Sequence, residues 1–189
     1  MIFQLFRHTP RDDTIASLYG MIVAQARAPA FYQICGVPDT VNGRFEMVVL
    51  HTILLVARFD AEPARERGQA IFDWFCRDMD ANLREMGVGD LAVPRTMRRI
   101  GEAFYGRQAA YQTALAAAAL EPLAAALARN VFGSEGGAGA HRLAAYVREA
   151  VRHLAAQDAD ALSRGEGGFP DPAAVATPDA GPIAQGART

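Results

Sequence analysis

The sequence ARERGQAIFDWFCRDMDANLREM occupies residues 64–86, and its apolar residues recur at steps of three and four. This spacing places them on one face of an α-helix, while the charged residues fall elsewhere around it. The apolar stripe consists of Ile71, Phe72, Phe75, Cys76, Met79, Leu83 and Met86. The following GVGD, residues 87–90, contains glycines that tolerate left-handed geometry and end a helix. The segment therefore predicts a long amphipathic helix packed on a helical core.

Helical periodicity extends in both directions from this segment. Further helices are predicted at residues 12–27, 43–60, 94–119, 122–132 and 141–162, with a short apolar piece at residues 31–37. The helix at residues 43–60 is apolar nearly all round, so we expect it at the centre of the domain. Gly, Pro and Ala dominate from residue 165 onward, which predicts a tail too poor in apolar groups to fold.

The sequence thus predicts an all-α fold, a single compact helical domain of about six helices. We place this domain at residues 12–163, an N-terminal segment at residues 1–11 and a disordered tail at residues 164–189. The length of 189 residues suits one domain with a real core.

Composition narrows the function classes. The net charge of −2 and the pI near 6.1 give no basic field, so we expect no sequence-specific nucleic-acid partner. Cys35 and Cys76 form no CxxC pair, which argues against a disulfide framework or a zinc ribbon. The N-terminus lacks the pattern of a secretory signal, and the longest apolar run, residues 47–57, is too short to span a bilayer. We expect a cytoplasmic protein.

The residues that carry catalytic chemistry are poorly arranged for it. The four histidines fall on separate predicted elements, and His51, in the apolar helix, is interpreted as a core histidine bonded to a neighbouring carbonyl rather than as a ligand or base. Asp78 and Asp80 are two positions apart, which separates them by about 200° on a helix and prevents shared binding of a metal. We predict no catalytic residue, no metal site and no cofactor.

Residues 78–107 combine acidic, basic, methionine and aromatic side chains around the glycine-rich turn. Gly106, inside a predicted helix, costs about 1 kcal/mol relative to alanine and indicates close packing around Tyr105 and Arg107. Two interpretations stay open: tight helix–helix packing, or a groove where methionine and aromatic groups accept an apolar partner and Arg/Asp pairs fix its register.

Residues 72–111 match the pattern FDxFxxDMDxxLREMGVGDLxVPxxMxxxxEAFYGRxxAY. This stretch closely resembles the ubiquinol-cytochrome c chaperone family, and the likeness extends over about residues 18–132. The resemblance implies a non-enzymatic assembly factor that helps newly made cytochrome b mature into the respiratory bc1 complex. It implies cytochrome b as the client. Since the sequence shows no presequence-like extension, we expect a bacterial member on the cytoplasmic side, with peripheral contact with the inner membrane or the ribosome as a further hypothesis.

The resemblance does not say which residues touch the client, so side-chain chemistry guides the choice. The candidate polar residues are Asp80, Arg84, Glu85 and Asp90, with Arg98, Arg99 and Arg107 opposite them, and the candidate apolar contacts are Met86, Leu91, Met97 and Tyr105. We expect Arg107→Ala to weaken client capture without unfolding the domain. Phe72, Phe75, Met79 and Phe104 are assigned to the core.

The alternative function is an all-α protein or enzyme that binds an isoprenoid or quinone. That class needs a deep apolar tunnel, with an acidic metal site at its mouth if diphosphate is handled, whereas a client site is a broad surface groove.

Overall fold

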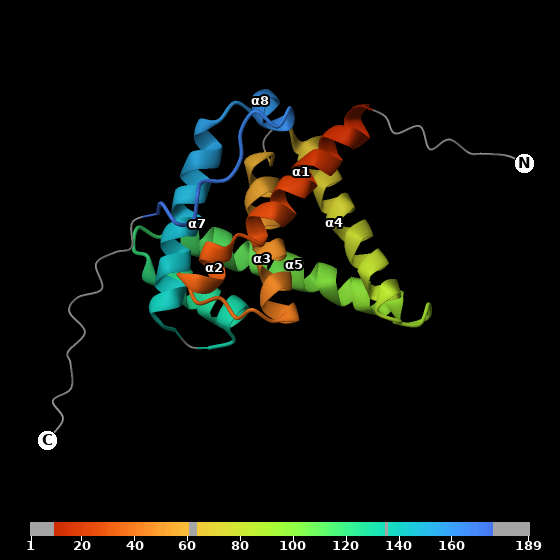
Figure 1. Cartoon of the computed structure of the whole chain (residues 1–189), viewed down its shortest axis with the longest axis horizontal. Helices are drawn as coiled ribbons and strands as arrows, with labels where there is room; N and C mark the ends of the chain where they lie inside the picture. Colours follow the sequence, from red (N-terminus) through yellow and green to blue (C-terminus); the bar gives the residue numbers. More distant parts are fainter. Residues whose placement is uncertain (1–9, 61–63, 135, 176–189) are drawn as a thin grey trace, which may run out of the picture.

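The computed structural model describes residues 10–60, 64–134 and 136–175, and Figure 1 shows their arrangement. The elements are α1 (Pro10–Ala26), α2 (Pro29–Gln33), α3 (Val41–Arg58), α4 (Arg65–Glu85), α5 (Val93–Leu115), α6 (Glu121–Leu127), the π-helical segment η1 (Ala128–Phe132), α7 (Ala138–Ala156) and α8 (Ala159–Ser163). The described residues contain no strand, which confirms the all-α prediction. None of their helices is both long and apolar enough to cross a membrane.

Helix α3 is the central element, as its apolar surface predicts. Residues 49–55 are all buried, and α3 contacts α1, α4, α5 and α7. Thr40 caps its first turn by accepting a 3.1 Å hydrogen bond from the Gly43 backbone N–H. In Figure 1, α3 runs between α7 and α4, and α5 crosses it. The core is thus built around one helix.

Helix α4 is amphipathic and packs as its stripe predicts. Ile71, Phe75 and Leu83 are buried on it, and Phe72 and Met79 are partly buried against the core. Met86 departs from the prediction, because α4 ends at Glu85 and leaves Met86 66% exposed in the turn. Gly87 follows with φ = +81°, the left-handed conformation that reverses the chain toward α5.

Two predicted helices end earlier in the structure, because side chains form hydrogen bonds with backbone groups beyond their last turns. Helix α5 ends at Leu115 rather than residue 119, and the Arg148 guanidinium donates to the carbonyls of residues 117, 118 and 119 at 2.7–3.1 Å. The predicted helix at residues 141–162 is broken after Ala156, because the Asp158 carboxylate accepts hydrogen bonds from the N–H groups of Asp160 and Ala161 and starts α8.

The prediction of disorder is wrong for residues 164–175. The Phe169 ring lies 5.0 Å from the His51 ring, and Gln25 Nε2 donates to the Pro170 carbonyl at 2.9 Å. The Gln157 amide donates to the Gly168 carbonyl and accepts from the Gly168 N–H, both at 2.8 Å. The Phe169 ring and the side-chain amides of Gln25 and Gln157 therefore hold this segment against the helices. Residues 1–9 and 176–189, where the other terminal predictions fall, lie outside the described residues.

Candidate functional site

The turn between α4 and α5 forms the first candidate surface. We call residues 80–99 the α4–α5 corner; it lies at the end of the fold opposite α7 (Figure 1). Its backbone closes through hydrogen bonds from Gly87 N to Arg84 O at 2.9 Å and from Val88 N to Leu83 O at 3.0 Å. Val93 is buried at the start of α5.

Arg84 joins the acidic groups of the corner. Its Nε lies 2.7 Å from Asp80 Oδ2, and its Nη1 lies 2.5 Å from Asp90 Oδ1. All three side chains are solvent-exposed to a large extent, so the bonds stabilise the domain little but do hold the turn in one arrangement. The structure thus brings together the predicted polar residues Asp80, Arg84 and Asp90, with Glu85 exposed beside them.

The predicted arginines do not face this acidic set. Arg98 pairs with Glu102 one turn further along α5, at 2.8 Å. Arg99 is exposed and makes no ion pair with any residue the structure describes. Leu91 is 99% exposed and Met97 is half-buried, so the corner offers apolar contact near the exposed guanidinium group of Arg99.

Arg107 lies outside the α4–α5 corner and is paired with Glu46 instead of facing the acidic set. Its Nη2 lies 2.5 Å from Glu46 Oε1 and its Nε lies 2.7 Å from Glu46 Oε2, a bidentate pair that ties α5 to α3. Glu46 is only 3% exposed, and burial raises the pKa of its carboxyl group while the Arg107 hydrogen bonds act to lower it. Arg107 therefore has a structural role and is left out of the corner, and its contact with the client stays a prediction.

Gly106 also departs from its prediction. It is exposed, and a β-carbon placed on it would have no neighbouring atom within 4 Å. The close packing that its presence suggested is therefore absent on this side of α5. Gly106 places no side chain next to Tyr105, which is 55% exposed.

A groove does form, but on the first half of α4 rather than at the corner. We call it the aromatic hollow; it has a volume of about 260 Å³ and lies between the end of α3, α4 and the middle of α5. Its lining consists of Val56, Phe59, Asp60, Arg65, Gly68, Gln69, Phe72, Phe104, Tyr105 and Gln108. The Tyr105 ring lies 5.3 Å from Phe72 and 5.7 Å from Phe104. Tyr105 is thus part of an aromatic cluster that reaches the surface.

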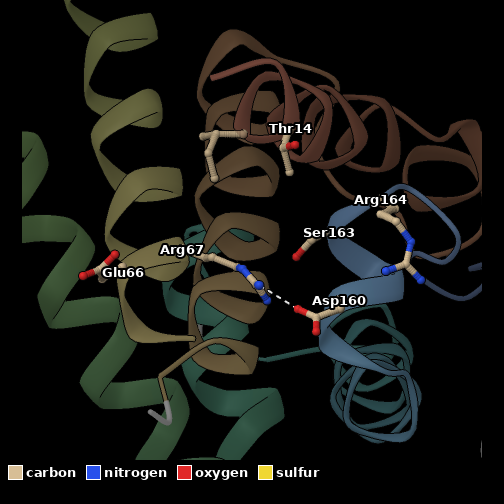
Figure 2. Close-up of a pocket in the computed structure, with 7 residues that line it drawn as sticks. Thr14, Glu66, Arg67, Asp160, Ser163 and Arg164 are labelled. Carbon is tan, nitrogen blue, oxygen red and sulfur yellow. Dashed lines mark hydrogen bonds and ion pairs between the residues drawn. The ribbon is translucent and has the colours of Figure 1, made fainter. Parts of the chain in front are cut away.

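A larger hollow of about 550 Å³ lies between α1, α4 and α8, and Figure 2 shows its lining. Arg67 Nη2 pairs with Asp160 Oδ1 at 2.6 Å across it, and Ser163 and Arg164 add further polar groups. This charged lining differs from the apolar tunnel that an isoprenoid requires. No cluster of three metal-binding side chains occurs in the part of the chain that the structure describes. The charged lining of this hollow gives the isoprenoid alternative no support.

The interpretation of His51 as a core residue is confirmed. The ring is fully buried; Nδ1 donates to the Met47 carbonyl at 2.7 Å, and Nε2 accepts from the Tyr146 hydroxyl at 2.9 Å. The carbonyl can only accept, which assigns the proton of the neutral ring to Nδ1. Burial lowers the pKa of His51 to about 4, so the ring is neutral at pH 7.

Comparisons with known proteins cover most of this chain. A family model described as ubiquinol-cytochrome C chaperone matches residues 33–169. The crystal structure of the Cbp3 homolog from Brucella abortus is similar, with 39% sequence identity, a TM-score of 0.81, and coverage of 93% of this chain and 100% of that one. A comparison with curated protein sequences gives no match. The range matched by the family model contains the α4–α5 corner and the aromatic hollow.

Proposed function

The chain belongs to the ubiquinol-cytochrome C chaperone family, and from this premise we propose that it binds newly made cytochrome b and promotes its assembly into the bc1 complex. A chaperone of this kind is not an enzyme: it covers apolar surface of its client until that surface is buried in the finished complex. The proposal places the protein on the cytoplasmic side, in peripheral contact with the inner membrane or the ribosome.

The observation that carries the proposal is where the chain exposes apolar side chains. Six large apolar side chains are exposed among the described residues, and Met86, Leu91 and Tyr105 are three of them. Met86 and Leu91 flank the same glycine-rich turn, and apolar groups that are exposed together are typical of a surface that binds another protein. We propose as client contacts Asp80, Arg84, Glu85, Met86, Asp90, Leu91, Met97, Arg98, Arg99 and Tyr105.

The biological test is deletion of the gene from the organism that carries it. We expect the bc1 complex and haem-containing cytochrome b to fall severalfold in membranes of the deletion strain, because unprotected cytochrome b aggregates or is degraded. Reduced-minus-oxidised spectra of membranes and native gels measure both quantities. Normal bc1 levels in that strain would disprove the proposed function.

The exposed apolar side chains of the α4–α5 corner can be tested by substitution. The double variant Met86→Ser with Leu91→Ser removes two exposed apolar contacts, so we expect capture of cytochrome b by the tagged protein to fall severalfold at unchanged melting temperature. Val41→Ser is the matched control, because Val41 is 81% exposed at the start of α3 and away from the corner. Equal capture by the double variant and the control would remove the corner from the client surface.

A further inference from the structure

Residues 167–172, with the sequence GGFPDP, follow α8 and run back along α7, in blue in Figure 1. We call them the strap. The Gln157 amide pairs with the N–H and the carbonyl of Gly168, both at 2.8 Å, and Gln25 Nε2 donates to the Pro170 carbonyl at 2.9 Å. These hydrogen bonds use main-chain atoms of the strap, so they do not depend on which side chains it carries.

One aromatic ring completes the contact of the strap with the helices. The Phe169 ring is half-buried and lies 5.0 Å from the His51 ring in an edge-to-face arrangement. Four side chains touch the strap, and we call them its seat: Met21, Gln25, His51 and Gln157. The seat lies where α1, α3 and the end of α7 meet.

The seat has room only for small residues before the ring. A β-carbon added to Gly167 would lie 2.0 Å from Gln157 Oε1, and one added to Gly168 would lie 3.0 Å from Met21 Sδ. Both distances are shorter than an ordinary van der Waals contact. The seat therefore fits a segment with two small residues followed by an aromatic one, as at Phe169.

The hydrogen-bonded network beneath the strap is complete without it. His51 bonds to the Met47 carbonyl and to the Tyr146 hydroxyl, and that hydroxyl accepts a 3.0 Å hydrogen bond from Gln25 Nε2. These groups keep their partners when the strap leaves. The side chains that would lose a partner are those of Gln25 and Gln157, and both are half-buried, so water can take the place of the strap there.

The strap is loosely packed beyond its ring. A hollow of about 690 Å³ is lined by Pro170, Asp171, Ala174 and Val175 together with residues of α7, so this part of the chain does not pack tightly on that helix. Ordering a segment costs conformational entropy, and glycine loses the most freedom. With two glycines and one half-buried ring, the strap has a low local stability, and we expect it to open more readily than the helices around it.

We propose that the seat is a peptide-binding site, which the strap covers in the resting chain and which a segment of the client with two small residues before an aromatic one takes over. Main-chain hydrogen bonds supply affinity and the place for the ring supplies selectivity. The strap competes from within the same chain and lowers the apparent affinity for the client. This inference rests on the proposed function and adds a client contact apart from the α4–α5 corner.

A binding test uses the full chain and a fluorescent peptide, GEGGFPDP, which copies residues 165–172. Phe169→Ala removes the ring of the strap and leaves the seat unchanged, so we expect this chain to bind the peptide about tenfold more tightly than the unchanged chain does. Val41→Ala is the matched control, because it removes an exposed apolar side chain at the start of α3, and it should bind as the unchanged chain does. A peptide with alanine in place of its phenylalanine should bind each chain more weakly.

Two further variants test the strap and the seat separately. Gly168→Val displaces the strap by another route, since its side chain would meet Met21 Sδ, and it should also bind the peptide more tightly than the unchanged chain. Adding Gln157→Ala to Phe169→Ala should weaken peptide binding severalfold, because it deletes the amide that pairs with the main chain. Equal binding by the unchanged, Phe169→Ala and Gly168→Val chains would overturn the inference. A large fall in the melting temperature of both single variants would also overturn it, because the strap would then be a fixed part of the core.

Capture of cytochrome b separates this inference from the proposed function. The tagged Phe169→Ala chain should retain severalfold more cytochrome b than the tagged Val41→Ala chain, because its seat is open to the client. Equal capture by these two chains, in an organism whose bc1 complex needs the gene, would overturn the client role of the seat and leave the chaperone function standing. Normal bc1 levels in the deletion strain, together with tight peptide binding by Phe169→Ala, would disprove the proposed function and leave the peptide-binding site.

Discussion

Arg107→Ala is expected to lower the free energy of unfolding by about 3–5 kcal/mol, the cost typical of breaking a buried ion pair from one side. The substitution leaves the Glu46 carboxylate, 3% exposed, without the two hydrogen bonds that now compensate its burial. The variant chain keeps the desolvation cost of the Glu46 carboxylate and loses its attraction to the Arg107 guanidinium. Urea unfolding followed by far-ultraviolet circular dichroism at pH 7 measures the loss.

A control variant and a rescue variant test whether the loss of stability comes from the Glu46–Arg107 pair. Arg98→Ala removes an exposed arginine from the same helix, where its pair with Glu102 is open to water, and should leave the unfolding midpoint unchanged. The double variant Glu46→Met with Arg107→Met should regain much of the lost stability, because no unpaired charge stays buried. An Arg107→Ala chain as stable as the parent but unable to capture cytochrome b would restore Arg107 to the client surface.

Local periodicity carried most of the fold prediction, since the burial of Ile71 and Phe75 on one face of α4 follows from their spacing. The errors arose where distant side chains act on the backbone. Arg148 holds carbonyls about thirty positions away, and Phe169 reaches across to His51. Neither contact has a local pattern, because it depends on how the helices pack.

In the candidate surfaces too, local features could be predicted and contacts between distant residues could not. Leu91 and Met86 are exposed, as their prediction as client contacts requires, although the stripe of α4 had placed Met86 on its apolar face. The aromatic hollow could not be predicted, since its lining comes from three helices that meet only in the folded chain. The Glu46 pair was missed although a signal existed: one carboxylate in a helix apolar nearly all round requires a buried partner.

Acidification should reveal His51 as a neutral core residue. Its pKa is about 4 in the folded chain against about 6.5 when unfolded, so between these values the unfolded chain binds a proton that the folded chain does not. The stability is therefore complete above pH 6.5 and falls as the pH drops, by about 2 kcal/mol at pH 5. The rings of Phe31, Tyr146 and Phe169 surround His51 and supply no carboxylate to hold the charge.

Urea unfolding at pH 7.0 and pH 5.0 measures this loss in the unchanged chain and in two variants. His51→Gln removes the titrating ring and should flatten the dependence on pH, whereas His153→Gln removes an exposed histidine of α7 and should keep it. Tyr146→Phe is a second probe, because it keeps the ring but deletes the hydroxyl that donates to Nε2. Equal slopes for the His51→Gln and His153→Gln chains would show that His51 is not the source of the acid sensitivity. Asp158 cannot mimic the effect, because the Ala161 N–H lowers its pKa from 3.8 and its stabilisation is therefore lost only at more acidic pH than this test covers.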